Sequence, residues 1–288
     1  MLGNMAFHET IPNRIGVGYK PQHLDDILKD PSPIAWLEIH AENYMGGGGR
    51  PIAQLNRLRE IFPISCHGVG LSIGGEDPLD KEHLSRLKHL VDWLNPGLFS
   101  EHLAWSTHAG HFLNDLLPVP YTQSTLDRVV SHITEVQDTL KRQMLLENPS
   151  TYCAFEQSEM SEIAFLTEVV DRSGCGLLLD INNVFISATN QNFEANDYID
   201  VYPLHHVGEM HLGGHTVDAD DFGETLLIDS HANSVVDPVW ELYRYTLKRS
   251  GPRPTLIEWD NDIPAWDTLA QEAKLADDIL SQTALVTV

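Results

Sequence analysis

Residues 143–181 read QMLLENPSTYCAFEQSEMSEIAFLTEVVDRSGCGLLLDI, and this stretch decides the fold. A short apolar run stands at each end, and between them the apolar residues of Ser161–Arg172 recur three and four positions apart. That period predicts an amphipathic helix, with Ser161 as its N-cap and Gly174 at its carboxyl end. A strand, a helix and a second strand in this order indicate parallel strands joined by a right-handed crossover.

The same unit recurs on both sides of this stretch. Strands are predicted at Ile15–Tyr19, Ile34–Ile39, Phe62–His67, Gly97–Leu103, Gln143–Glu147, Gly176–Ile181, His206–Leu212 and Pro254–Trp259. Further helices are predicted at Gln54–Ile61, His83–Leu94, Ser124–Arg142 (with Ser124 as N-cap), Val235–Lys248 and Ala265–Leu280. Eight strands alternating with helices predict a closed α/β (β/α)8 TIM-type barrel of the xylose-isomerase-like kind, formed by residues 1–288 as one metal-binding domain.

Composition excludes several classes of protein. The chain has 18 Lys and Arg against 42 Asp and Glu, a formal net charge of −24, which disfavours nucleic acid as a partner. No apolar run is long enough to predict a membrane span, and no basic start followed by an apolar run predicts a signal peptide. The three cysteines, 66, 153 and 175, are odd in number and lack paired spacing, so we expect a cytoplasmic protein.

Residues that can bind a metal stand at the carboxyl ends of six predicted strands, where barrel enzymes place their active sites. These residues are His67, His102, Glu147, Asp180, His211 and Glu258. Carboxylates gathered at one rim repel one another, and a bound cation relieves that repulsion. The sequence therefore predicts a metal site in a cup of histidines and carboxylates.

The long connection Gly213–Ser234 exceeds the two to six residues usual for such a loop and is predicted to be functional. It adds three candidate ligands to the cup, and Asn183, which follows Asp180, adds an amide oxygen. The three loop residues are His215, Asp229 and His231.

Three further polar residues are predicted to support the ligands without binding the metal. Glu101 and His102 are adjacent, so a regular strand points only one of them into the cup and leaves the other in the supporting position, unless a bulge intervenes. Glu209 shares the face of His211 but lies deeper in the barrel, and Asn182 follows the ligand Asp180.

The predicted ligands are nitrogen and oxygen atoms only, because Cys66 is expected to point away from the cup beside His67. This donor set disfavours a structural zinc site and fits iron, manganese or catalytic zinc. Spacing alone does not choose between iron and zinc.

Seven ordered motifs along most of the chain resemble one family. They are HGVGLSIG (67–74), SEHLAWS (100–106), LENPS (146–150), LLLDINNV (177–184), GEMHLGGH (208–215), DSHANSV (229–235) and LIEWDND (256–262). Together they resemble the multinuclear non-heme iron-dependent oxidative enzymes, a family that includes the oxidase of methanobactin biosynthesis. The resemblance implies an enzyme that uses dioxygen to oxidise side chains, commonly cysteine, in a small ribosomally made precursor peptide. It also implies a separate partner protein that presents this peptide.

The resemblance further implies two or three iron ions, as Fe2+ and Fe3+, and a set of ligands for each. The first ion would be held by His67, His102 and Glu147, which leaves Glu101 as the residue that supports His102. The second would share Glu147 and add Asp180, His211 and Glu258. The third would use Asn183, His215, Asp229 and His231. Glu147, Asp180 and His211 are the residues expected to be catalytic.

Other functions remain open at this point. The same three-site layout resembles the trinuclear-zinc endonucleases that cut DNA at abasic sites, although those need a basic groove. A metal-dependent sugar isomerase of the xylose type would place a lysine near the metals, and Lys20 is the only lysine near a predicted strand end. A metal-storage module without turnover is the third alternative.

Overall fold

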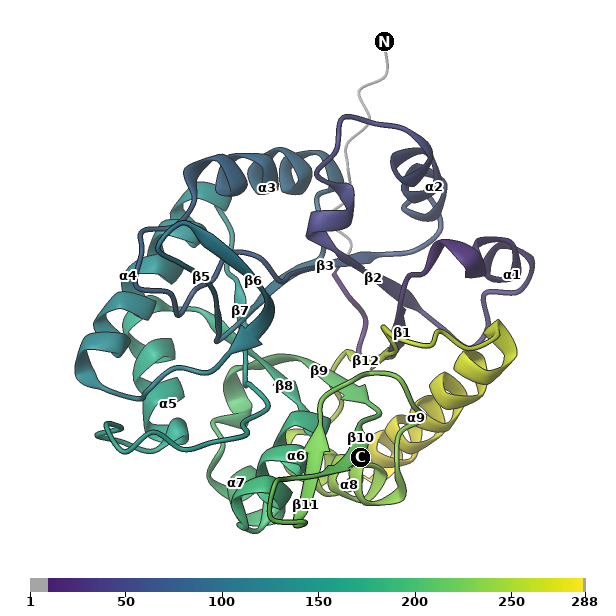
Figure 1. Cartoon of the computed structure of the whole chain (residues 1–288). Helices are drawn as coiled ribbons and strands as arrows, with labels where there is room; N and C mark the ends of the chain where they lie inside the picture. Colours follow the sequence, from purple (N-terminus) through teal and green to yellow (C-terminus); the bar gives the residue numbers. More distant parts are fainter. Residues whose placement is uncertain (1–9, 287–288) are drawn as a thin grey trace.

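The structure, a computed structural model, describes residues 10–286 and consists of a closed barrel of eight parallel strands surrounded by helices (Figure 1). The barrel strands are β1 (Ile15–Gly18), β2 (Trp36–His40), β3 (Ile64–Gly68), β4 (Leu98–His102), β7 (Leu145–Glu147), β8 (Gly176–Asp180), β9 (Val207–Gly213) and β12 (Thr255–Glu258). Pairing of β1 with β12 closes the barrel, so the predicted fold is confirmed. Residues 1–9, which bear on the expected lack of a signal peptide, lie outside the described part.

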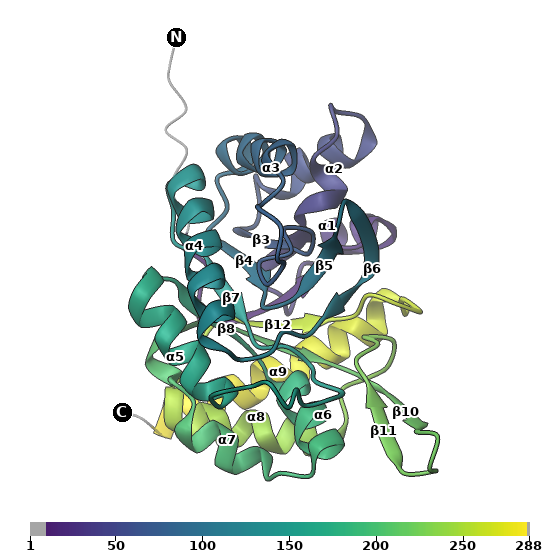
Figure 2. The same cartoon turned by 60° about the vertical axis from the view of Figure 1, so that its left-hand side comes forward.

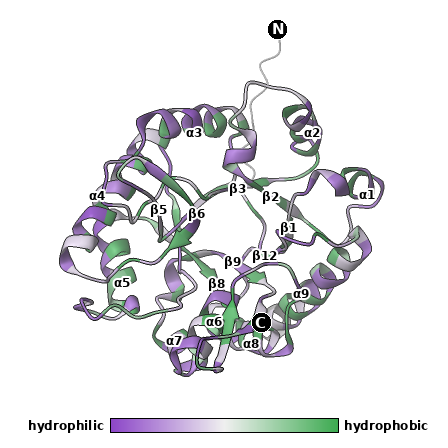
Figure 3. Ribbon diagram, viewed as in Figure 1, coloured by the Kyte–Doolittle hydropathy of each residue, from purple (hydrophilic) through white to green (hydrophobic). Residues whose placement is uncertain are grey.

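The helices cover the outside of the barrel and carry alternating hydrophobic and hydrophilic bands (Figure 3). They are α1 (Leu24–Lys29), α2 (Arg50–Leu58), α3 (Lys81–Leu94), α4 (Gln123–Leu140), α5 (Glu162–Ser173), α6 (Ile181–Gln191), α7 (Ala195–Val201), α8 (Asp237–Ser250) and α9 (Trp266–Val286). Three short 3-10 turns, Pro21–His23, Ala41–Tyr44 and Leu204–His206, complete the connections. None of the helices in residues 10–286 combines the length and the apolar character that crossing a bilayer requires.

The helix caps test the sequence predictions in detail. The Ser161 side chain accepts a hydrogen bond from the Ala164 N–H, and Gly174 ends α5 at φ 70°, as predicted. The prediction of Ser124 as the N-cap of α4 was wrong. Thr122 has the extended backbone of a cap and accepts from the Thr125 N–H, so Ser124 lies inside the first turn.

Two β-hairpins project from the same side of the barrel, and neither was predicted (Figure 2). One, β5 (Trp105–His108) and β6 (His111–Leu117), follows β4. The other, β10 (Thr216–Ala219) and β11 (Thr225–Ile228), lies within the long connection after β9. Each hairpin belongs to a loop that leaves the carboxyl end of a barrel strand, so both stand beside the barrel mouth.

The amino end of the barrel interior is filled by Trp36, which is fully buried and packs with Ile11 and Leu256. The Trp36 indole N–H donates to the Arg14 carbonyl at 2.9 Å. The ring occupies space left by Gly16, where a Cβ atom would lie only 2.4 Å from it. Because side chains two residues apart on a strand share a face, Glu38 and His40 follow Trp36 toward the carboxyl end.

Candidate metal centre

Six strands bring their last inward-facing residues together at the carboxyl end of the barrel, and His67, Glu147, Asp180, His211 and Glu258 are all almost fully buried. His102 is slightly more exposed. Strand β4 has no bulge, and its His102 points into the cup. Glu101 points the other way, where its carboxylate accepts the Leu71 N–H at 2.9 Å and the His102 N–H at 3.1 Å.

The first group of candidate ligands is His67, His102 and Glu147. The Nε2 atoms of the two histidines are 2.8 Å apart, and Glu147 Oε2 lies 3.5 Å from His67 Nε2 and 3.2 Å from His102 Nδ1. Nitrogen and oxygen ligands bound at about 2.1 Å to one ion lie about 3 Å from each other. One ligand atom from each of the three residues lies within 4.8 Å of the other two, so the three side chains surround a space that a cation can enter. Burial lowers the pKa of His67 well below its usual value and that of His102 to about 4, which keeps both in the neutral form that binds metals.

The second group joins Glu147 to Asp180 and His211. Burial raises the pKa of Glu147 well above its usual value, and burial with the nearby Asp229 raises that of Asp180 to about 7. His211 Nδ1 lies 3.1 Å from Glu258 Oε2, which connects Glu258 to the same group. Glu258 is also buried, but the charges of His231 and His211 outweigh burial and lower its pKa well below its usual value.

The third set is only partly assembled in the structure. His231 Nε2 lies 2.8 Å from Asp229 Oδ1, and His231 also groups with Asp180 and Glu258. His215 is separated from Asp229 by the Asn182 amide, whose Oδ1 lies 2.8 Å from His215 Nδ1 and whose Nδ2 donates to Asp229 at 3.3 Å. Asn182 therefore links two of the predicted ligands.

Unpartnered buried atoms show that these residues fit a cation. Glu147 Oε2, Asp180 Oδ2 and Asn183 Oδ1 have no hydrogen-bond partner among the described residues. An oxygen buried without a partner costs roughly 1–3 kcal/mol, and three in one cup are costly unless a cation binds them. The chemistry of the donor set, imidazole and carboxylate without thiolate, agrees: Cys66 is buried in the apolar core behind the cup.

Sequence reasoning missed three residues of this cup: Glu38, His40 and Asp260. The prediction ended the second strand at Ile39, whereas β2 extends to His40. His40 Nε2 lies 3.3 Å from Asp260 Oδ2 and 3.8 Å from Glu258 Oε1. Burial alone lowers the pKa of His40, but its contacts with Glu258 and Asp260 raise it above the usual value. The signal was present, since a seventh strand ending in histidine extends the pattern of the other six.

Glu38 lies one layer deeper, together with Glu209. Glu38 Oε1 is 3.4 Å from His211 Nε2, and Glu209 Oε1 is 3.9 Å from the same atom. Glu209 Oε2 also accepts from the Ser65 hydroxyl at 3.3 Å. Glu209 was predicted to support His211 from this depth. Glu38 is closer to the imidazole than Glu209 is, so the layer beneath His211 contains two carboxylates.

Lys20, the residue that left a sugar isomerase as an alternative function, lies at the rim of the cup. Its Nζ is 2.5 Å from Asp260 Oδ1, and neither side chain is fully exposed. The ion pair holds Asp260 beside His40.

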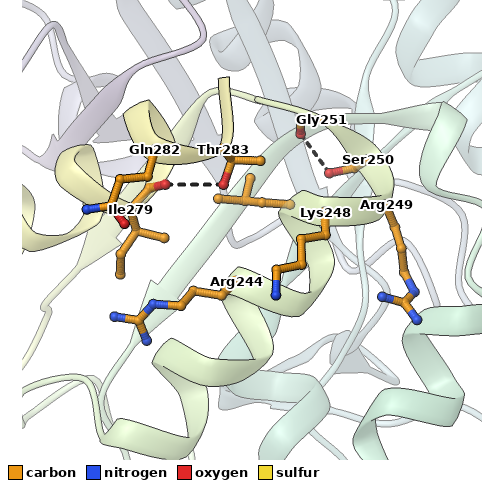
Figure 4. Close-up of a pocket in the computed structure, with 9 residues that line it drawn as sticks. Arg244, Lys248, Arg249, Ser250, Gly251, Ile279, Gln282 and Thr283 are labelled. Carbon is orange, nitrogen blue, oxygen red and sulfur yellow. Dashed lines mark hydrogen bonds between the residues drawn. The ribbon is translucent and has the colours of Figure 1, made fainter. Parts of the chain in front are cut away.

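A separate cavity of about 560 Å³ lies where α8 ends, lined by α8 and α9 (Figure 4). Arg244, Lys248 and Arg249 surround it, in an otherwise acidic protein. Arg249 pairs with Asp200 at 2.6 Å and lies over the Tyr245 ring. Lys248 and Arg249 stand in the last turn of α8, where cations offset the negative end of the helix, and this accounts for these two residues without a ligand.

Comparison with solved structures supports the fold. An L-ribulose 3-epimerase superposes with a TM-score of 0.63 at 16% identity, covering 95% of this chain and 96% of that one. Endonuclease IV from Thermus thermophilus gives 0.60 at 14%, covering 93% and 99%. A xylose isomerase-like TIM barrel protein from Mycobacterium smegmatis, in complex with magnesium, gives 0.59 at 13%, covering 91% and 88%. At such identities these similarities concern the fold alone, and they confirm its xylose-isomerase-like kind.

Sequence comparison is more specific. A UPF0276 protein from Paraburkholderia phytofirmans is 54% identical over 93% of this chain and 87% of its own length. One from Rhizobium meliloti is 53% identical over the same shares. Residues 14–281 match the profile of a family described as the RiPP precursor modification enzyme MbnB/TglH/ChrH, where RiPP denotes a ribosomally synthesised and post-translationally modified peptide. The chain therefore belongs to this family of enzymes that modify peptide precursors.

Proposed function

We propose that this protein is a multinuclear non-heme iron enzyme that uses dioxygen to oxidise a cysteine side chain in a small precursor peptide. Membership of a family that modifies RiPP precursors supports the peptide substrate. The observation that carries the proposal is the position of Glu147, which belongs to two candidate ligand groups at once and has an unpartnered buried oxygen. A carboxylate shared in this way suits a bridge between two ions.

The three ligand sets are proposed as follows, with zinc or manganese as the competing metals. His67, His102 and Glu147 hold one iron; Glu147, Asp180, His211 and Glu258 hold a second; Asn183, His215, Asp229 and His231 hold a third. When bound, iron supplies a site for the substrate thiolate and for dioxygen and accepts electrons from the substrate.

The residues of the chain contribute geometry and charge. Ser100 Oγ lies 2.7 Å from His67 Nδ1 and fixes that ring so that Nε2 faces the cup. The Asp180 carboxylate accepts the Asn183 N–H at 2.6 Å, so the start of α6 orients one oxygen and leaves the other free. Asn183 Nδ2 lies 3.4 Å from Glu147 Oε1 and restrains the proposed bridging carboxylate. Catalytic roles are assigned to Glu147, Asp180 and His211.

We further propose a partner protein that presents the peptide, and a cytoplasmic location. Three free cysteines, of which Cys153 is exposed, favour a reducing compartment.

The decisive experiment compares Glu147→Ala with Asp229→Ala after anaerobic purification. Glu147→Ala should lose both of the first two irons, because its carboxylate belongs to both sites, whereas Asp229→Ala should empty mainly the third. Metal content per folded protein measures this, with circular dichroism as the control for folding. Two irons retained in Glu147→Ala would contradict the assignment.

Oxygen consumption with cysteine-containing peptides then separates the proposed oxidase from the alternatives. An iron-loaded protein that consumes no dioxygen with any such peptide indicates metal storage. Zinc at full occupancy together with anaerobic cleavage of phosphodiesters indicates a hydrolase.

A further inference from the structure

The β5–β6 hairpin presents an unusual edge at the barrel mouth (Figure 2). Residues 111–116 of β6 are all exposed, and they include Phe112 at 64%, Leu113 at 40% and Leu116 at 39%. Edge strands of soluble proteins are usually protected by charged residues or proline, because an open edge pairs with other chains. Phe112, Leu113 and Leu116 give this open edge an exposed apolar surface beside the candidate active site, where a peptide can dock.

The backbone of this edge is not satisfied within the hairpin. Trp105 pairs with Leu117 and Thr107 pairs with Phe112, so the four residues 113–116 lie opposite Ser106 alone. The Ser106 N–H is itself directed to Ser72 Oγ at 3.0 Å. One residue cannot pair with four, and of these four the Leu116 N–H bonds locally to Asp115 Oδ1 at 2.8 Å. The bulge thus leaves backbone donors and acceptors available to an added extended strand.

The same residues border a cavity of about 260 Å³ that reaches the candidate metal centre. It is lined by Phe112, Asn114, Asp115 and Leu116 of β6. It is also lined by His102, Asn183 and Asp229 of the candidate metal centre and by Tyr152 of the β7–α5 loop, whose hydroxyl accepts the Asp229 N–H at 3.0 Å. A chain lying along β6 could therefore direct a side chain to the metal ligands without leaving the surface.

We propose that residues 112–116 of β6 bind the precursor peptide as an added strand, next to the residue that is modified. The peptide backbone pairs with the bulged segment, and the side chain to be modified enters the cavity toward His102 and Asp229. Asp115 and Asp229 border this path in a chain of net charge −24, so the docked segment is neutral or basic, not acidic. The proposal rests on the peptide substrate proposed above.

The test uses the iron-loaded protein and a displayed library of short random peptides, each with one central cysteine. Enriched peptides are synthesised, and their dissociation constants are measured for three proteins: wild type, Leu116→Asp and Val217→Asp. Val217 is the matched control, since it is 68% exposed and lies on β10 of the other hairpin.

The expected result is enrichment of peptides with few acidic residues. Leu116→Asp should weaken their binding about ten-fold or more, because it removes an apolar contact and places a carboxylate that loses its water under the docked peptide, while Val217→Asp should leave it within about two-fold. Failure to enrich any peptide over the bare support overturns the proposal. So does an equal effect of the two substitutions.

Backbone pairing is tested separately with N-methylated versions of one enriched peptide. An added strand uses every second N–H, so methylation should weaken binding at alternate positions. Equal tolerance at all positions overturns strand addition.

Oxygen consumption with the enriched peptides distinguishes failure of this inference from failure of the proposed function. Peptides that bind through β6 without being oxidised support the docking edge and contradict the oxidase. Peptides that are oxidised with the same KM by wild type and Leu116→Asp support the oxidase and contradict the docking edge.

Discussion

The two ends of the barrel interior are built from the same strands, but the amino end buries apolar side chains and the carboxyl end buries charged and polar ones. At the amino end Trp36 packs with Ile11 and Leu256, and its one polar atom donates to the Arg14 carbonyl. At the carboxyl end, four residues further along the same strand, His40 lies among carboxylates. The first end stabilises the fold by burying apolar surface. The second is unfavourable for folding by itself, because it buries charges and unpartnered oxygens that a cation must stabilise.

The largest effect is expected at the amino end. Trp36→Ala removes a fully buried ring and should lower the free energy of unfolding by about 3–5 kcal/mol. Urea denaturation measures this, and Phe222→Ala is the control, because Phe222 is 91% exposed and should change stability by less than about 0.5 kcal/mol. Metal content per folded molecule should stay the same. A loss of metal from the folded Trp36→Ala protein would contradict the proposed division between the two ends.

An intermediate effect is expected in the layer beneath the cup. Glu38 Oε1 lies 3.4 Å from His211 Nε2 and can fix the ring so that Nδ1 faces the cup. Glu38→Gln should weaken metal binding about 10–100-fold while the protein remains folded. Competition with a chelator of known affinity measures this.

The matched variant is Glu209→Gln, since its nearest oxygen is 3.9 Å from the same nitrogen. It should weaken binding less than Glu38→Gln does. If Glu209→Gln has the larger effect, Glu209 and not Glu38 orients His211.

The smallest effect concerns the metal-free cup. Burial, with the charge of Asp229, raises the pKa of Asp180 to about 7. Folded protein therefore keeps a proton that unfolded protein has lost, and this group makes stability fall as pH rises from about 4 to about 7. Asp180→Asn should stabilise the chelated protein by about 1 kcal/mol or more near pH 7 and hardly at all near pH 4.

Asparagine is the conservative choice for this test because it also caps helices, and the Asp180 side chain caps α6. Urea denaturation in the presence of a chelator, repeated across this pH range, gives the difference between the two proteins. A difference that does not grow with pH would mean that Asp180 is ionised in the folded protein.

Most of the cup could be predicted because its histidines and carboxylates stand at the carboxyl ends of strands that local apolar patterns locate. Short apolar stretches of five to seven residues located the strands, and in parallel barrels the carboxyl ends of the strands meet at one rim. That rule predicted His67, Glu147, Asp180, His211 and Glu258, and the family resemblance selected His102 over its neighbour Glu101. The structure brings all six together. Their roles as iron ligands are still a prediction.

The features that were missed depend on the exact end of a strand and on the register between paired strands. Ending the second strand one residue early removed His40, and with it the alternation that turns Glu38 inward. The bulge in β6 was equally hidden, because it follows from a register between β5 and β6 that no local period encodes.

By itself, the sequence determined the alternation of strands and helices, the parallel barrel and the identity of the residues at its rim. These depend on local hydrophobic periods and on the fixed direction of side chains along a strand. Only the tertiary structure decided which residues share a cation-sized space, since closure of β1 against β12 and β2 brings His40 beside Glu258 and Asp260. It also decided that Asn182 stands between His215 and Asp229, because side chains of different loops meet only once the barrel has closed.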